Sequence, residues 1–371
     1  MKANSKLKKE GIQIIEKLDT QKVNKIAINV ASKLCLAFPE HNFNRSELFE
    51  SISRLSMFIA KMPQDSSGAK FILNNNSIYF NENLSLDEMS KLAVHECIHF
   101  IQHSRNTENY SNIGLYNTSS TIGTALNEAA VQLMASEANF EASSSETYFG
   151  ISLNTISPDY YPLECTLVEE ITYFTGTYPL YHSALYGNDI FKNTFTLKIG
   201  KNAYKTIISN LDKILNLENN LNCYINELQY ANKVNAIREL NNIINKLKKE
   251  ITKIFYKTQN IIIEKCFKNE FNSVRNIKDL SEFTKKLYNF KNIMGYSDDY
   301  TFYNEFYRQM MNYVQEKKTY IEQYGEINLF ESINQSLMIV DNTKNAFSFI
   351  GKFISKVKKL IPFAQTQRKY N

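Results

Sequence analysis

The segment KFILNNNSIYFN, residues 70–81, restricts the fold more than any other part of the sequence. Apolar and polar residues alternate on both sides of an Asn-rich turn, which predicts two strands joined as a β-hairpin. Shortly afterwards Ser85 and Glu88 form a capping box, in which each side chain satisfies a free backbone N–H of the other residue. The sequence therefore predicts a hairpin followed directly by a helix that starts near Ser85.

The predicted helix contains VHECIHFIQH, residues 94–103, with three of the chain's 5 histidines. His95 and His99 are one helical turn apart, so their side chains stand one above the other and can bind the same zinc ion. Glu96 lies about 100° around the helix, where its carboxylate can reach a metal-bound water without binding the metal. His103 lies about 6 Å further along the helix, too far to share the ion, and is interpreted as a residue beside the ligands or at the surface. The alternative for the whole motif is an exposed helix end whose histidines are only solvated.

The third ligand is expected on a second helix, predicted from the helical spacing of TALNEAAVQLMASEANF, residues 124–140. Glu128 lies near the start of this helix, and the small Ala129 and Ala130 allow a close approach to the histidine helix. Glu128 is therefore the candidate ligand, and the alternative is a solvated glutamate that the helix dipole favours near an N-terminus. Glu137 points about 180° away from Glu128 and is expected to face solvent.

The sequences HECIH at residues 95–99 and NEAA at residues 127–130 together resemble the gluzincin branch of the zincin metallopeptidases, at the level of the clan. The resemblance covers roughly residues 67–210 of the chain. The hairpin at residues 70–81 resembles the edge-strand region that flanks the cleft in zincins and pairs with an extended peptide. The resemblance therefore implies a peptide or protein substrate.

The resemblance also implies a role for each residue of the motif. His95, His99 and Glu128 would hold Zn²⁺ with a fourth position open for water, and Glu96 would act as the general base. Zincins usually add a Tyr or His that stabilises the oxyanion, and His182 is the candidate here, together with three neighbouring tyrosines. The alternative for this aromatic group is simple packing. The three tyrosines are Tyr178, Tyr181 and Tyr186.

Helical periodicity predicts the organisation of the rest of the chain. Apolar residues recur at helical spacing over residues 23–38 and 48–62, and a proline follows each run, which predicts two N-terminal helices. We expect residues 1–66 to pack these helices on a metallopeptidase domain of residues 67–210, and residues 211–371 to form an all-α domain. The expected fold class is α+β and predominantly helical. The zincin-like domain is expected to contain a small antiparallel sheet or hairpin and the active-site helix.

Two patterns stand out in the predicted C-terminal domain. Apolar residues step by three and four over residues 237–254, which predicts a helical hairpin or short coiled coil within the chain. Residues 347–361 place apolar side chains on one face of a helix and lysines on the other, which predicts a basic amphipathic tail. Such a tail can make peripheral contact with an anionic membrane, or it can dock its apolar face on the body of the protein.

Composition restricts the partners and the compartment. The net charge is only +5 over 371 residues, and basic residues are mixed with 38 acidic ones, so no nucleic-acid partner is expected. The 5 cysteines show no two-residue spacing, which favours a reducing compartment. The N-terminal apolar run is too short for an export signal, and no segment approaches the roughly 18 to 20 apolar residues of a membrane span. A soluble, cytoplasmic protein is therefore expected.

Together these features predict a zinc-dependent metallopeptidase that hydrolyses peptide bonds, with Glu96 as the general base. The alternative is a catalytically silent zincin fold that binds partners through its helical C-terminal region. The sequence indicates neither the preferred substrate side chain nor an oligomeric state.

Overall fold

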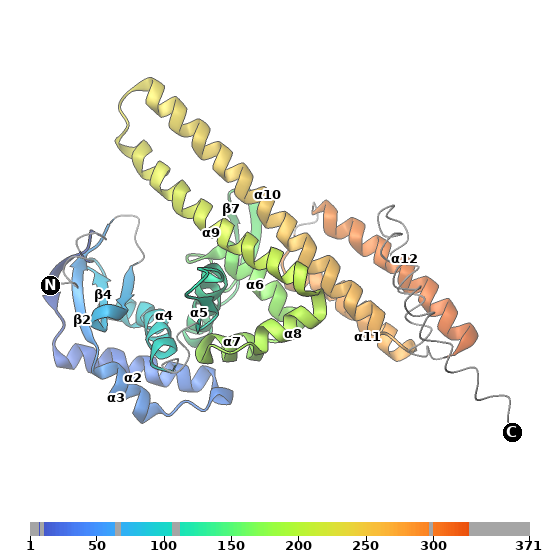
Figure 1. Ribbon diagram of the computed structural model, residues 1–371, viewed down its shortest axis with the longest axis horizontal. Helices are drawn as coiled ribbons and strands as arrows, with labels where there is room; N and C mark the ends of the chain where they lie inside the picture. The colour runs from blue at the N-terminus through green and yellow to red at the C-terminus, as the bar shows by residue number, and fades with distance from the viewer. Residues whose placement is uncertain (1–6, 8–10, 64–67, 106–111, 297–299, 326–371) are drawn as a thin grey trace. The chain divides into compact units, whose positions relative to one another are not determined.

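The computed structural model describes residue 7 and residues 11–63, 68–105, 112–296 and 300–325 (Figure 1). This part of the chain is predominantly helical with small sheets, which confirms the expected α+β class. The chain divides into two compact units, Met1–Cys266 with Phe290–Asn304 and Phe267–Asn289 with Glu305–Asn371. The basic amphipathic tail predicted at residues 347–361 lies outside the described residues. Within the described ranges, no helix is long and apolar enough to cross a membrane.

The first unit contains a four-stranded sheet in the order β1-β2-β4-β3. The predicted hairpin is confirmed, because β3 (Ala69–Ile72) pairs antiparallel with β4 (Ser77–Asn81). On its other side β4 pairs in parallel with β2 (Ser56–Lys61), so the sheet is mixed and not purely antiparallel as expected. β1 (Gln13–Lys17) pairs antiparallel with β2 and is one edge strand of the sheet. β3 is the other edge strand.

The N-terminal region supplies strands as well as helices, which corrects part of the sequence prediction. The first predicted helix is present as α2 (Thr20–Ala37), but the second, α3 (Arg45–Ser53), ends early. The residues that follow form β2, which bonds to strands on both sides and buries Met57 and Ala60. A short apolar run fits a helix or a strand equally well, and here the sheet satisfies its backbone groups on both edges.

The helix that carries the histidine motif starts where the capping box places it. Ser85 N donates to Glu88 Oε2 at 2.7 Å, Glu88 N donates to Ser85 Oγ at 3.3 Å, and α4 (Leu86–Arg105) follows. α4 packs against β3, α2 and two later helices, α5 (Thr124–Ala138) and α7 (Thr177–Tyr186). Its buried face includes Ala93, Val94, Cys97, Ile98 and Ile101.

α5 is the central helix of the first unit, since most of its residues are buried. It contacts α4, α7, α6 (Pro162–Thr175) and α9 (Lys201–Tyr230). The predicted helix that contains Glu128 is therefore confirmed and lies beside α4. The remaining small elements are β5 (Asn112–Ile113), β6 (Tyr116–Asn117), β7 (Ser144–Tyr148), β8 (Ile151–Thr155) and α8 (Ile190–Ile199).

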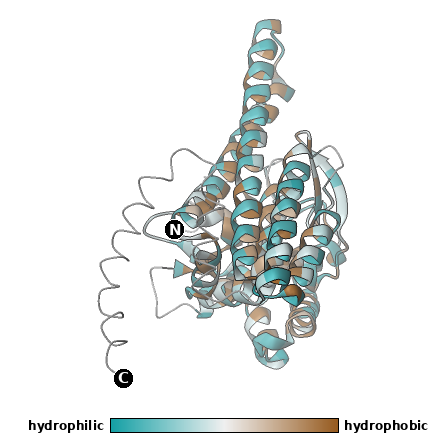
Figure 2. Ribbon diagram, turned by 90° about the vertical axis from the view of Figure 1, so that its right-hand side faces the viewer, coloured by the Kyte–Doolittle hydropathy of each residue, from teal (hydrophilic) through white to brown (hydrophobic). Residues whose placement is uncertain are grey.

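α9 and α10 (Val234–Ser273) run side by side as a long helical hairpin (Figure 1). Asn210 Nδ2 donates to Thr258 Oγ1 at 2.9 Å, and Lys213 Nζ lies 2.6 Å from Glu250 Oε1, which fixes the antiparallel pairing. Hydrophobic and hydrophilic residues alternate along the long helices in Figure 2, as expected for amphipathic helices. The predicted helical hairpin is confirmed.

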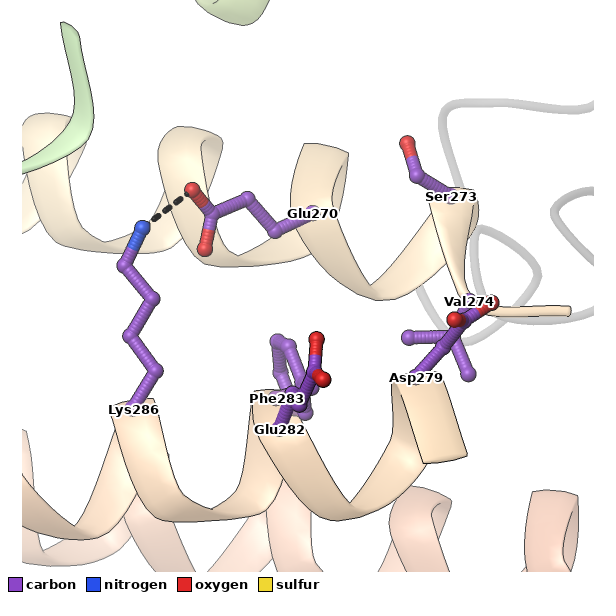
Figure 3. A pocket seen from close by; sticks show the side chains of 7 residues that line it. All are labelled: Glu270, Ser273, Val274, Asp279, Glu282, Phe283 and Lys286. Carbon is purple, nitrogen blue, oxygen red and sulfur yellow. Dashed lines mark hydrogen bonds and ion pairs between the residues drawn. The ribbon is translucent and has the colours of Figure 1, made fainter. Parts of the chain in front are cut away.

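The second unit is a small helical assembly built from the end of α10, α11 (Ile277–Ile293) and α12 (Thr301–Tyr324). The ring of Phe267 lies 6.0 Å from the rings of Phe283 and Phe306, which forms its aromatic core. A hollow in this unit contains an ion pair in which Lys286 Nζ lies 2.6 Å from Glu270 Oε1 (Figure 3). The hollow is lined by Glu270, Ser273, Val274, Asp279, Glu282, Phe283 and Lys286.

Candidate metal centre

Three side chains from α4 and α5 converge on one point. The Nε2 atoms of His95 and His99 lie 3.1 Å apart, and Glu128 Oε2 lies 3.6 Å from the first and 3.4 Å from the second. In a tetrahedral site with zinc bonds of about 2.0–2.1 Å, neighbouring ligand atoms are about 3.3–3.4 Å apart. The observed triangle therefore has the size that a single zinc ion requires. In the part of the chain that the structure describes, this is the only such group of three His, Cys, Asp or Glu side chains.

Hydrogen bonds to two glutamines set the tautomers of both histidines. His95 Nδ1 lies 2.9 Å from Gln132 Oε1, and His99 Nδ1 lies 3.0 Å from Gln102 Oε1. Because an amide oxygen only accepts, each ring in its neutral form carries its proton on Nδ1 and its lone pair on Nε2. Metal-binding histidines are typically oriented by such a partner on the second ring nitrogen. The two imidazoles are thus prepared to bind a cation through Nε2.

The orientation of Gln102 is fixed by its other contacts. Its Nε2 donates to Asn127 Oδ1 at 2.9 Å and to the carbonyl oxygen of Ala184 at 3.0 Å, so its oxygen must face His99. Asn127 Oδ1 also accepts from Leu115 N at 3.0 Å. Since Asn127 directly precedes Glu128, this network connects the His99 side of the site to the Glu128 side. Sequence reasoning missed it, although Gln102 follows His99 at the helical spacing of three residues.

Gly114 is required by the same network. Its φ is +58°, and a Cβ at this position would collide with Asn127 Oδ1 and Gln102 Nε2. Any other residue would therefore displace the side chains that orient His99 and hold the start of α5.

The electrostatics of the site favour a bound cation. Burial alone would raise the pKa of Glu128, but the charges and hydrogen bonds of His99 and His95 outweigh this effect and hold it well below its usual range. Burial would lower the pKa of His99, but Glu128 outweighs it, and the pKa rises to about 9. The carboxylate therefore stays ionised, and a metal ion and a proton compete for the same imidazole nitrogen.

Glu96 is positioned by the edge strand of the sheet. The side chain is buried, with the whole residue only 8 % exposed, and Oε2 accepts from Phe71 N in β3 at 2.6 Å. The predicted hairpin therefore holds one oxygen of the predicted general base. His103, also on α4, contacts the Phe71 ring with 6.2 Å between ring centroids and is not one of the three converging side chains.

Tyr161 is a residue of the site that sequence reasoning missed. Its ring stacks on His95 with 6.3 Å between centroids, and its phenol lies close enough to feel the charge of the Glu128 carboxylate. Burial, together with the carboxylates of Glu128 and Glu96, raises the pKa of Tyr161 well above its usual value, so the phenol keeps its proton. Its φ is +51°, a conformation that is costly for a bulky residue and that often marks functional sites. The one available sequence signal was Pro162. Proline is common at the first position of a helix, so it marks the start of α6 and makes Tyr161 the N-cap residue.

Among the described residues, no hydrogen bond or ring contact joins His182 to His95, His99 or Glu128. His182 contacts the rings of Tyr186, Tyr178 and His41, with centroid distances of 4.6, 5.3 and 6.1 Å. Tyr161, and not His182, is the residue beside Glu128. His182 lies on the face of α7 that contacts these rings. Helical periodicity did not predict which residues this face would contact.

Glu137 was also misplaced by the sequence prediction. It does not face solvent freely, because it is half-buried and accepts a hydrogen bond from Tyr181 Oη at 2.6 Å. α5 is enclosed by helices on several sides, so a residue pointing away from Glu128 still meets protein.

Comparisons with known proteins give no match: no family model, no curated protein and no solved structure matches this chain. The function must therefore be argued from the site. The site combines two oriented imidazoles, one ionised carboxylate, a second carboxylate held by a strand edge, and a protonated phenol. These are the groups that metal-assisted hydrolysis uses.

Proposed function

We propose that the protein is a zinc-dependent metallopeptidase of the gluzincin type. The observation that carries the proposal is the triangle of His95 Nε2, His99 Nε2 and Glu128 Oε2, whose edges are 3.1, 3.4 and 3.6 Å. Two imidazoles and one carboxylate are typical ligands of catalytic zinc sites, which use three protein ligands and leave one position open. A zinc ion held there supplies a Lewis acid beside a substrate carbonyl and acidifies water in the open position.

Glu96 is assigned the role of general base. A carboxylate next to a ligand, but outside the ligand set, can take a proton from attacking water and later deliver it to the leaving amine. The hydrogen bond from Phe71 N restricts the motion of the carboxylate, so that the proton acceptor is oriented before substrate arrives.

Tyr161 is assigned the stabilisation of the oxyanion. Its phenol remains protonated and lies against Glu128, so it offers a hydrogen-bond donor at the centre where the oxyanion would form. A fixed donor in a buried site stabilises developing negative charge more strongly than water does.

The proposed substrate is a peptide or protein in extended conformation. β3 is the edge strand of the sheet, and the N–H of its Phe71 points to Glu96 on α4 and not to the neighbouring strand. An extended chain laid along this edge would bring its backbone to the general base. We include a cytoplasmic location in the proposal, which agrees with the 5 cysteines being free thiols.

The test combines metal analysis with cleavage of a complex peptide library, read by mass spectrometry. Wild type and Glu96→Gln should both hold one zinc per chain, and only wild type should cleave, with the loss roughly 10²- to 10⁴-fold or more. Glu227→Gln, an exposed glutamate on α9, is the matched control and should behave as wild type. Wild type without zinc would end the metal assignment. Zinc without cleavage would favour the catalytically silent fold that binds partners through its helical region.

A further inference from the structure

A second group of chemically active side chains lies away from the metal centre. It joins the 3-10 turn η1 (Pro39–His41) and the loop after it to the end of α4 and to α7. Arg105 lies about 120° around α4 from His99, so it faces a different side of the helix from the metal ligands. We call this group the α7 cluster, and its members are His41, Phe43, Arg105, Tyr178, His182 and Tyr186.

The members of the α7 cluster form a closed ring of neighbours. Arg105 Cζ lies 5.0 Å from the centre of the Phe43 ring and 4.8 Å from the centre of the Tyr186 ring. His182 continues the ring, 4.6 Å from Tyr186 and 6.1 Å from His41, and His41 returns to Phe43 at 6.2 Å. The two aromatic rings hold the guanidinium in place, so its planar donors need little ordering to bind a ligand.

Several polar atoms of the cluster have no partner within the protein. Both ring nitrogens of His41 and Nη1 of Arg105 are buried and make no hydrogen bond. The carboxylate against His41 is Glu40, whose Oε1 is 3.7 Å from Nε2, too long for a hydrogen bond, on a side chain that is 42 % exposed. Buried polar groups nearly always have partners. The N–H groups of Arg105 Nη1 and of the neutral His41 ring therefore lack an acceptor, which a ligand from outside the chain can supply.

His182 contributes a further donor. The N–H of Ile190 donates to Asn188 Oδ1 at 3.1 Å, which fixes the orientation of that amide because a backbone N–H cannot accept. Asn188 Nδ2 therefore donates to His182 Nδ1 at 2.9 Å, and the ring proton of neutral His182 must be on Nε2. The cluster thus combines one permanent positive charge with imidazole N–H groups.

We propose that the α7 cluster binds an oxyanion, a phosphate or a carboxylate group, through Arg105 and His41, with His182 as an additional donor. An oxyanion supplies the oxygen acceptors that these buried donors lack, and a guanidinium matches its geometry. Tyr178, whose ring stacks on His41 with 5.4 Å between centroids and 6° between planes, holds that imidazole in place. The site is independent of the metal centre and of the proposed peptidase activity.

The test is calorimetric titration of the full chain with inorganic phosphate and, separately, with acetate. Each titration is run with zinc bound and after chelation, and binding that persists after chelation is assigned to the α7 cluster. Arg105→Met should weaken it roughly tenfold to a hundredfold, the usual effect of losing a charge-assisted hydrogen bond. Arg238→Met, at an exposed arginine on α10, is the matched control and should leave the affinity unchanged.

A second variant keeps the proposal testable if Arg105→Met misfolds. His41→Phe preserves the stacking on Tyr178 but removes both ring nitrogens, and it should also weaken binding while circular dichroism and zinc content stay unchanged. Phosphate binding without acetate binding assigns a phosphate ligand, and comparable binding of both assigns a carboxylate or any simple oxyanion. No binding of either at millimolar concentration, or full binding by both variants, would overturn the proposal.

Discussion

Asp212 offers a direct test of whether the α9–α10 hairpin positions Glu128, the proposed metal ligand. Its Oδ2 accepts from Gly123 N at 2.8 Å, and its Oδ1 accepts from Ala125 N at 2.9 Å. Gly123 is the N-cap residue of α5 and has no side chain to do this itself. Glu128 lies little more than one turn further along the same helix. Asp212 therefore supplies, from a distant helix, the cap that holds the start of the Glu128 helix.

The size of the effect follows from the two hydrogen bonds. Loss of a capping side chain costs about 1–2 kcal/mol, and a carboxylate at a helix N-terminus also interacts favourably with the helix dipole. Mutation of residues that orient metal ligands typically lowers metal affinity about 10- to 100-fold. We expect Asp212→Ala to lower the free energy of unfolding by about 1–2 kcal/mol. We expect it to weaken zinc binding about tenfold, which corresponds to about 1.4 kcal/mol.

Zinc affinity is measured by competition with a chromogenic chelator, and stability by urea denaturation of the metal-free chain. Asp212→Asn should show a smaller effect because one acceptor remains. Glu250→Ala removes an ion pair elsewhere on the same hairpin and serves as the control, with zinc affinity unchanged. If Asp212→Ala bound zinc as tightly as wild type while losing stability, the cap would not position Glu128, and the reasoning would be refuted.

Three further predictions concern Tyr161, Gly114 and Glu170. Tyr161→Phe should lower kcat roughly 10²- to 10³-fold with little change in KM or zinc content, because only the oxyanion donor is lost. A loss of bound zinc as large as the loss of kcat would contradict this role. Gly114→Ala should reduce both thermal stability and zinc affinity, because the added methyl displaces Gln102, and a fully zinc-loaded, wild-type-like variant would count against it. Burial raises the pKa of Glu170 from 4.5 to about 8, although hydrogen bonds from Tyr296 and Gln259 act in the opposite direction. The protonated side chain therefore contributes fully to the free energy of unfolding below about pH 4.5. This contribution is lost as the pH rises through about 8. Glu170→Gln should therefore lose less stability than wild type between pH 5 and pH 8 in urea denaturation, and parallel pH profiles would disprove this.

The sequence by itself determined the elements whose signals are local. The capping box at Ser85 places the start of α4, and the one-turn spacing of His95 and His99 places their side chains together, because both depend on contacts within a few residues. The β3–β4 hairpin follows from alternation and an Asn-rich turn in the same way. Glu128 was also correctly brought to the histidines, since the small residues after it allow α5 to pack against α4.

The tertiary structure decided whatever depends on residues far apart in the chain. Residues 56–61 became β2 because β1 and β4 both satisfy its backbone groups, a preference that a short apolar run does not encode. Tyr161 lies beside Glu128 because the start of α6 packs against α5, whereas the ring contacts of His182 are with Tyr186 and the other rings of its cluster. The tautomer of His95 and the cap from Asp212 likewise depend on side chains that meet only when the helices pack. Periodicity specifies the face of an element, and packing specifies what that face contacts.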